Sequence, residues 1–198
     1  MKLVARLAGF AMCFAPALAH AFPLYALPRL LAHLPAPEIE AARINRSGPH
    51  LSGLDFVLST FDRSVVGKFR EAWHRVGNGA LPTESVVLIL RMRDGSFDTF
   101  MPSPTNEYKR FTFAWRPATI AIVHTHPNSS TATPEGGDLD LADKYKVPIF
   151  TLTSRGMFVY DPATRKTTRV LDGVEWGDDA AWQQLHARLA GRPAINGR

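Results

Sequence analysis

Residues 119–127 read Thr-Ile-Ala-Ile-Val-His-Thr-His-Pro, an apolar run that ends in two histidines one residue apart. Such a run is typical of a buried strand, and Pro127 ends it because proline has no N–H to donate to a neighbouring strand. Side chains alternate along a strand, so His124 and His126 share a face and can converge on one ion.

A carboxylate follows this strand after a loop rich in Ser, Thr and Pro. Asp138 comes after two glycines and opens the amphipathic stretch 138–145, which predicts a short helix. Imidazoles are the commonest zinc ligands, and a third protein ligand leaves the fourth position open, as in catalytic sites. We therefore predict a Zn²⁺ site formed by His124, His126 and Asp138. Asp140 is the alternative third ligand, and a strand-end histidine that is only hydrogen-bonded is the alternative to metal binding.

These residues resemble the motif of the JAMM (JAB/MPN) zinc metalloprotease superfamily. That motif is a distant upstream glutamate, then H-x-H-P, then a loop that ends in S-x-x-D, and the resemblance covers roughly residues 80–160. It implies that His124, His126 and Asp138 bind zinc and that Glu84 is the general acid/base. Glu84 opens the stretch 84–91, a strand by its β-branched and aliphatic residues. The alternative is an exposed glutamate with no role.

The chain departs from the motif in the loop before Asp138. The loop is one residue longer than the family pattern, and Glu135 stands where the family has serine. In the family that serine helps to hold the oxyanion of the tetrahedral intermediate, which a glutamate would repel. Other hydroxyls of this loop are then the candidates for oxyanion or substrate contacts, namely Ser129, Ser130 and Thr131, with Thr133 also close in sequence. These departures bear on peptidase activity more than on metal binding.

The first 21 residues have the pattern of a secretory signal peptide. Lys2 and Arg6 precede a short apolar stretch at 7–18, and Ala19-His20-Ala21 is an A-x-A cleavage site. A retained membrane anchor is the alternative, because residues 22–32 are also largely apolar. Cys13, the only cysteine, lies in the segment that would be removed, and Met12 before it argues against a lipid anchor. We therefore expect a secreted or periplasmic protein without disulfides and without a stable membrane anchor after cleavage.

Charge and length restrict the remaining possibilities. The formal net charge of the 198 residues is +5, and the basic residues are scattered rather than gathered with aromatic ones, so a nucleic-acid partner is not expected. Residues 22–50 are rich in Pro and Ala and form a predicted lead-in, and residues 51–198 suffice for a single domain.

Periodicity and turn residues predict the elements of that domain. Asp62 is placed to cap a helix that runs to about Val76, and Arg93-Asp94-Gly95-Ser96 predicts a hairpin turn. The predicted strands are 84–91, 97–101, 108–115, 119–125, 147–153, 157–160 and 167–171, and helices are predicted at 138–145 and 179–189. This pattern predicts an α+β fold with a mostly antiparallel or mixed sheet. The JAMM resemblance implies that the sheet is curved and flanked by helices.

Two functions from different classes fit these features. The first is an exported zinc-dependent hydrolase that cleaves a peptide or isopeptide bond in a peptide or protein substrate, such as a component of the cell envelope. The second is a non-catalytic binding or accessory module with the same fold. A domain of a secreted effector is a third, weaker possibility. Glu84 distinguishes the first from the second, because only an enzyme needs its carboxylate beside the metal.

Overall fold

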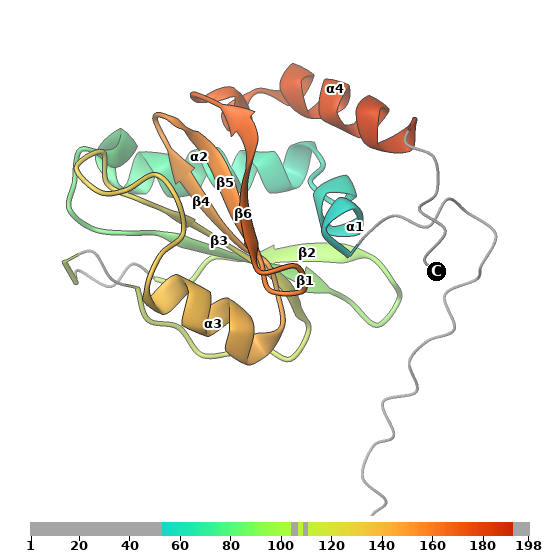
Figure 1. Ribbon diagram of the computed structural model, residues 1–198, viewed down its shortest axis with the longest axis horizontal. Helices are drawn as coiled ribbons and strands as arrows, with labels where there is room; N and C mark the ends of the chain where they lie inside the picture. Colours follow the sequence, from blue (N-terminus) through green and yellow to red (C-terminus); the bar gives the residue numbers. More distant parts are fainter. Residues whose placement is uncertain (1–52, 104–106, 109–110, 192–198) are drawn as a thin grey trace, which may run out of the picture. The chain divides into compact units, whose positions relative to one another are not determined.

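Six strands form one sheet in the order β2-β1-β3-β4-β5-β6 (Figure 1). The computed structural model describes residues 53–103, 107–108 and 111–191. The strands are β1 (Val86–Arg91), β2 (Phe97–Phe100), β3 (Thr119–Thr125), β4 (Ile149–Thr153), β5 (Gly156–Asp161) and β6 (Lys166–Asp172). Only β3 and β4 pair in parallel, and the other neighbours are antiparallel, so the sheet is mixed.

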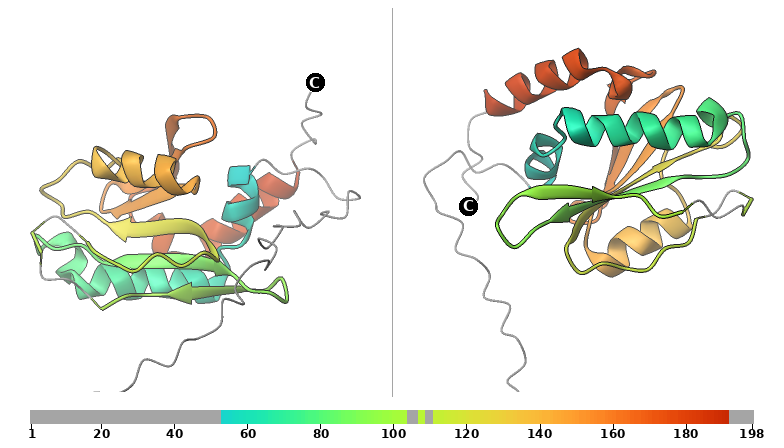
Figure 2. Two further views of the ribbon diagram at one scale, coloured as in Figure 1. Left: turned by 90° about the horizontal axis from the view of Figure 1, so that it is seen from below. Right: turned by 180° about the vertical axis from the view of Figure 1, so that it is seen from behind.

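Helices cover both faces of this sheet. The helices are α1 (Gly53–Ser59), α2 (Arg63–Arg75), α3 (Gly137–Tyr145) and α4 (Asp179–Ala190), with 3-10 turns η1 (Gly77–Gly79) and η2 (Glu175–Gly177). Figure 2 shows α1, α2 and α4 on one side of the strands and α3 on the other. The apolar side chains form one cluster on each face of the sheet. The larger cluster lies under α1, α2 and α4, and the smaller one lies under α3. The predicted α+β class is confirmed.

Helix α2 begins where the sequence predicts. The Asp62 side chain accepts hydrogen bonds from the amides of Ser64 at 2.8 Å and Val65 at 2.9 Å, which satisfies two of the amides left unpaired at a helix start. Val66 and Phe69, both fully buried, lie on the face that meets the sheet. The cap prediction is therefore confirmed.

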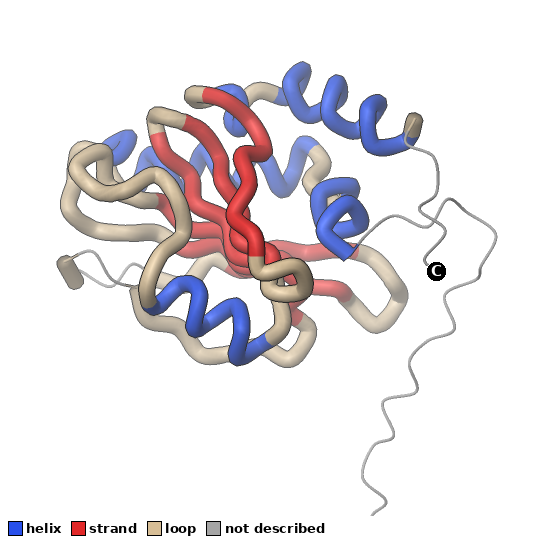
Figure 3. The backbone as a smooth tube through the Cα atoms, viewed as in Figure 1, coloured by secondary structure: helices blue, strands red, loops and turns tan. Residues whose placement is uncertain are grey.

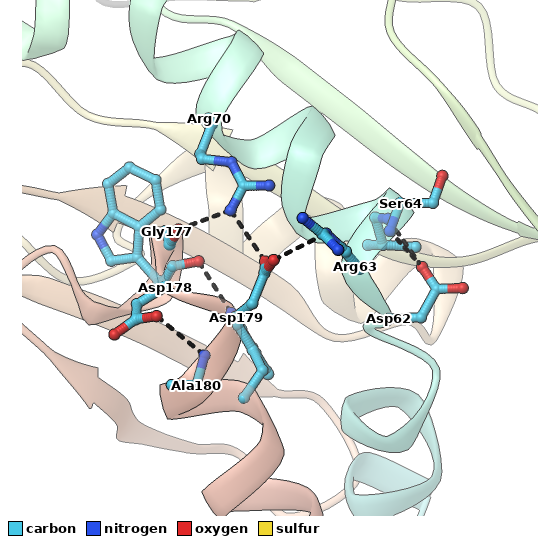
Figure 4. A network of polar contacts seen from close by, with 11 residues as sticks. Asp62, Arg63, Ser64, Arg70, Gly177, Asp178, Asp179 and Ala180 are labelled. Atoms are coloured by element: carbon cyan, nitrogen blue, oxygen red, sulfur yellow. Dashed lines mark hydrogen bonds and ion pairs between the residues drawn. The ribbon is translucent and has the colours of Figure 1, made fainter.

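Polar contacts join α2 to the start of α4 (Figure 4). Arg70 donates to the carbonyl of Gly177 at 2.8 Å and lies 3.0 Å from the Asp179 carboxylate. Arg63 approaches the other oxygen of the same carboxylate at 3.0 Å. Asp178 caps α4 by accepting from the Ala180 amide at 2.9 Å. These hydrogen bonds and ion pairs connect two helices that are far apart in the sequence and that both cover the large apolar cluster.

The expected strand at 108–115 is wrong. Of its described residues, 108 and 111–115, none belongs to a strand. Phe111, Phe113 and Trp115 are half-buried against the apolar cluster under α3, whereas Thr112 and Ala114 between them are exposed. The segment is extended and lies against the sheet instead of pairing with a strand, so it shows the alternation of a strand without its hydrogen bonds. Trp115 stacks on Tyr145 of α3 with ring centroids 3.7 Å apart.

The remaining predicted strands and helices are present with bounds shifted by a residue or two, and α1 is an additional helix that we did not expect. The proposed signal peptide at 1–21 and the lead-in at 22–50 lie outside the described residues. The described residues belong to one compact unit. No helix in the described ranges is long and apolar enough to cross a membrane.

Candidate metal centre

The register of β1 against β3 brings the upstream glutamate to the histidines. Val86 pairs with His124 in an antiparallel ladder. Two residues back along β1 and two residues on along β3 lead to Glu84 and His126, so the same face and the same end of both strands carry all three polar side chains. Their exposed fractions are 7 % for Glu84, 0 % for His124 and 5 % for His126. Strand pairing alone therefore gathers a buried carboxylate and two imidazoles.

These three residues form a group that could hold a metal ion. One ligand atom from each lies within 4.8 Å of the others. The Nε2 atoms of His124 and His126 are 2.9 Å apart. The sheet face under them carries mainly apolar side chains of the cluster beneath α3, with Thr151 of β4 beside His124. A buried cluster of this composition is uncommon without a partner for its polar atoms.

Asp138 completes the arrangement from the first turn of α3. Its Oδ1 lies 3.3 Å from Nε2 of His124 and its Oδ2 lies 3.4 Å from Nε2 of His126. Donor atoms bound tetrahedrally to zinc at about 2.0–2.1 Å would lie about 3.3 Å from one another. The two contacts of Asp138 have that spacing, whereas the two Nε2 atoms, 2.9 Å apart, are closer together, so a small separation of the imidazoles would let the donor set hold a zinc ion.

The backbone before α3 holds the Asp138 side chain in place. Gly136 has φ 51° and ψ −116°, a conformation that glycine adopts far more readily than other residues. The amide of Glu135 donates to Oδ2 of Asp138 at 3.1 Å. Asp140, the alternative third ligand, is exposed on α3 and has no contact with either histidine.

The loop between His126 and α3 is anchored to the sheet by side chains of β4 and the turn after it. Thr151 pairs with His124 across the parallel β3–β4 ladder and its hydroxyl donates to the carbonyl of Ala132. Arg155 donates to the carbonyl of Ser130. Nδ1 of His126 lies 2.8 Å from the carbonyl of Thr131. Figure 3 shows this long loop, in tan, between the end of β3 and α3.

The contacts shift the ionisation of two of these groups. Burial raises the pKa of the Asp138 carboxyl, but the charge and hydrogen bonds of His124 and His126 and the amide of Glu135 outweigh it, and the pKa lies well below its usual range. Burial lowers the pKa of His126, but its hydrogen bonds to Asp138 and to the Thr131 carbonyl outweigh that effect and hold the pKa above its ordinary value. The lowered pKa favours the carboxylate form of Asp138, which is the form of an aspartate that binds a metal.

A cavity of about 640 Å³ opens beside this centre. Glu84, His126 and Asp138 line it together with the three hydroxyl residues named from the sequence, Ser129, Ser130 and Thr131. The Ser130 hydroxyl oxygen is buried and has no hydrogen-bond partner among the described residues. Ser129 is exposed, and the Thr131 hydroxyl donates to the Thr133 carbonyl at 3.5 Å. The structure thus brings Glu84, His126, Asp138 and the hydroxyl residues 129–131 to one cavity. His124 is fully buried behind His126 and Asp138, and Asp140 and Thr133 do not line the cavity.

Two residues of the site were not anticipated. Phe111 lines the cavity and packs on the ring of His124 with centroids 4.8 Å apart. Its alternation with Phe113 was visible in the sequence but was interpreted as a strand. Thr151 supports the loop from β4, and the sequence shows it only as one of two threonines in a mainly apolar strand.

Comparisons of the chain with protein families, with curated proteins and with solved structures found no match.

Proposed function

We propose that the chain is a zinc-dependent hydrolase of the JAMM type that cleaves a peptide or isopeptide bond. The observation that carries the proposal is the donor triangle: the two Nε2 atoms 2.9 Å apart, with the Asp138 oxygens 3.3 Å and 3.4 Å from them. The triangle lies at a cavity that Glu84 also lines. A JAB/MPN-like architecture is part of the proposal, supported by H-x-H at a strand end and an aspartate at a helix start.

The residues divide into ligands and a proton-transfer group. His124, His126 and Asp138 would hold the ion, because their donor atoms lie near the spacing that a tetrahedral site requires. A zinc ion bound there supplies Lewis acidity, which polarises a carbonyl group and lowers the pKa of water. Glu84 is buried among these ligands, where its carboxylate accepts a proton from the attacking water and returns it to the leaving amine.

Ser130 provides the hydroxyl that the motif has at the position of Glu135. Its oxygen is buried, lacks a partner among the described residues and belongs to the cavity wall. A buried hydroxyl without a partner carries a desolvation cost, which is recovered when it donates to a substrate oxygen that becomes negative. The carboxylate of Glu135 cannot take this role, because carboxylate oxygens only accept hydrogen bonds.

Export is the second part of the proposal. Residues 1–21 would be removed as a signal peptide, and the substrate would then be a peptide or protein outside the cytoplasm, such as a cell-envelope component. The intact mass of the protein from its native host tests this part. A chain that still begins at Met1, or that carries acyl mass, would contradict it.

The alternative is a non-catalytic metal-binding module, and one observation favours it. Glu84 is near enough to both histidines to be a ligand itself. With Glu84 and Asp138 both bound, four protein donors would close the site and leave no position for a reacting molecule.

The experiment that separates the two measures zinc content and cleavage in wild type and in Glu84→Gln. Glutamine keeps the shape of the side chain but cannot take up a proton. The enzyme proposal expects full zinc content and a loss of cleavage on the order of 10²- to 10⁴-fold, using a screen of peptides, isopeptides and cell-wall fragments. Loss of zinc in Glu84→Gln, or a zinc-loaded wild type that cleaves nothing in the screen, would favour the binding module.

A further inference from the structure

Part of the cavity wall beside the proposed metal ligands combines apolar and anionic groups. Phe111 and Leu141 contribute apolar surface, from the extended segment and from α3. Glu135 lines the same cavity, and its amide donates to the Asp138 carboxylate at 3.1 Å. This glutamate is therefore a direct neighbour of a proposed metal ligand. The cavity therefore has apolar walls with a carboxylate beside them.

Within the described part of the chain, three carboxylates line the cavity, and Glu135 is the one whose charge is not balanced by a bound divalent ion. Glu84 and Asp138 together offset a divalent ion. Among the described residues that line the cavity, none is Lys or Arg. Arg155 is near the loop, but it donates to the Ser130 carbonyl and is not part of the lining. No ion pair of Glu135 occurs within the described residues. A loaded cavity would thus keep one net negative charge, at Glu135.

We infer that the cavity selects substrates with a lysine or arginine side chain next to the cleaved bond. This inference rests on the proposed hydrolase function and names its substrate class. The methylene stem of such a side chain packs along Phe111 and Leu141 while its charged end reaches Glu135 and solvent. Glu135 is then a specificity-determining residue, which gives the departure from the motif serine a role.

The geometry disfavours the opposite choice of substrate. An acidic side chain in the same place would lie against Glu135 in a cavity whose wall supplies no cation. A neutral aliphatic side chain would gain the apolar contacts but not the ionic one. An exposed ion pair is worth up to about 1 kcal/mol, so the expected preference for lysine over norleucine is about fivefold. Glutamate should be disfavoured further by repulsion.

The test uses three blocked peptides that differ at one residue, which is lysine, norleucine or glutamate. A library of acetylated, amidated peptides first identifies a cleaved sequence, and the varied residue is then placed on each side of the cut bond. The measured quantity is kcat/KM at low and high salt. Wild type should prefer lysine, Glu135→Gln should bring the lysine peptide to the level of the norleucine peptide, and Glu135→Lys should favour the glutamate peptide. Glu175→Gln, which removes the same charge from an exposed site on η2, is the matched control and should keep the wild-type order.

The outcomes separate this inference from the function on which it rests. Cleavage of all three peptides at equal rates by wild type overturns the inference and leaves the hydrolase proposal standing. If wild type cleaves no peptide, the hydrolase proposal fails, and the inference is decided by binding of the same three peptides, labelled with fluorescein, to the protein as purified. A lysine preference that Glu135→Gln removes then supports a cation-binding cavity, and equal binding of the three overturns it.

Discussion

The Nδ1 atom of His126 lies 2.8 Å from the carbonyl oxygen of Thr131. A carbonyl can only accept, so Nδ1 donates this hydrogen bond, and Nε2 is the ring nitrogen that faces Asp138 and His124. The loop at residues 127–131 therefore holds His126 with Nε2, rather than Nδ1, toward the other donors. Histidines that bind metals commonly donate their other ring N–H to a backbone carbonyl, so this contact supports the proposed role of His126 as a ligand.

The ligand set predicts a difference between two aspartates on the same helix. His126→Ala and Asp138→Ala should each lose bound zinc, because each removes one corner of the donor triangle. Asp140→Ala is the matched control, since it deletes an exposed carboxylate two residues further along α3, and it should keep full zinc content. Metal stoichiometry by mass spectrometry measures all three. Full occupancy in Asp138→Ala together with loss in Asp140→Ala would move the third ligand to Asp140.

The three hydroxyls of the loop should differ in their effect on turnover. Ser130→Ala should lower kcat on the order of 10²-fold with little change in KM, because an oxyanion donor acts in the transition state. Ser129→Ala and Thr131→Val should have smaller effects, because one hydroxyl is exposed and the other already donates within the loop. Steady-state kinetics on any cleaved peptide compare them. A larger loss in Ser129→Ala than in Ser130→Ala would assign the role to Ser129.

Thr151→Val should weaken metal binding from outside the ligand set. The hydroxyl of Thr151 holds the Ala132 carbonyl, next to the Thr131 carbonyl that orients His126. Valine has a similar shape but no hydroxyl, so the loop loses an anchor and the zinc Kd should rise by about tenfold. Competition with a chelating dye measures this Kd. Thr168→Val, on the exposed part of β6, is the control and should leave the Kd unchanged. An unchanged Kd in Thr151→Val would show that the hydroxyl is dispensable for the site.

Asp179→Asn should destabilise the fold, while a similar change at Asp172 should not. Asp179 forms ion pairs with two arginines of α2. It also lies in the first turn of α4, where the helix dipole favours a negative charge. Because these groups are partly exposed, the expected loss is about 1 kcal/mol in the free energy of unfolding, and it should shrink at high salt. Asp172 pairs with Arg169 at 2.6 Å, but both side chains are mostly exposed, so Asp172→Asn should be nearly neutral. Urea unfolding at two salt concentrations measures both variants, and equal effects would contradict the prediction.

Local patterns account for the elements that the sequence predicts correctly. The Asp62 cap, the alternation that gives His124 and His126 one face, and the hairpin turn at residues 93–96 depend on neighbours within a few residues. The same logic fails at Phe111–Trp115, because alternation reports only that one side of an extended segment is buried. It does not tell whether the segment is paired with a strand or lies against the face of a sheet.

Strand and helix periodicity are properties of consecutive residues, so the sequence was enough to predict which side chains are available as donors and how the nearest ones are spaced. That these donors meet at one place follows from the packing of the strands and helices. The antiparallel register of β1 against β3 carries Glu84 to the histidines, and the return from β3 through α3 to the parallel strand β4 carries Asp138 back over them. The position of Phe111 in the cavity wall and the support from Thr151 were decided at the same level. Register and crossover depend on packing between residues distant in the chain, which a single sequence records only weakly.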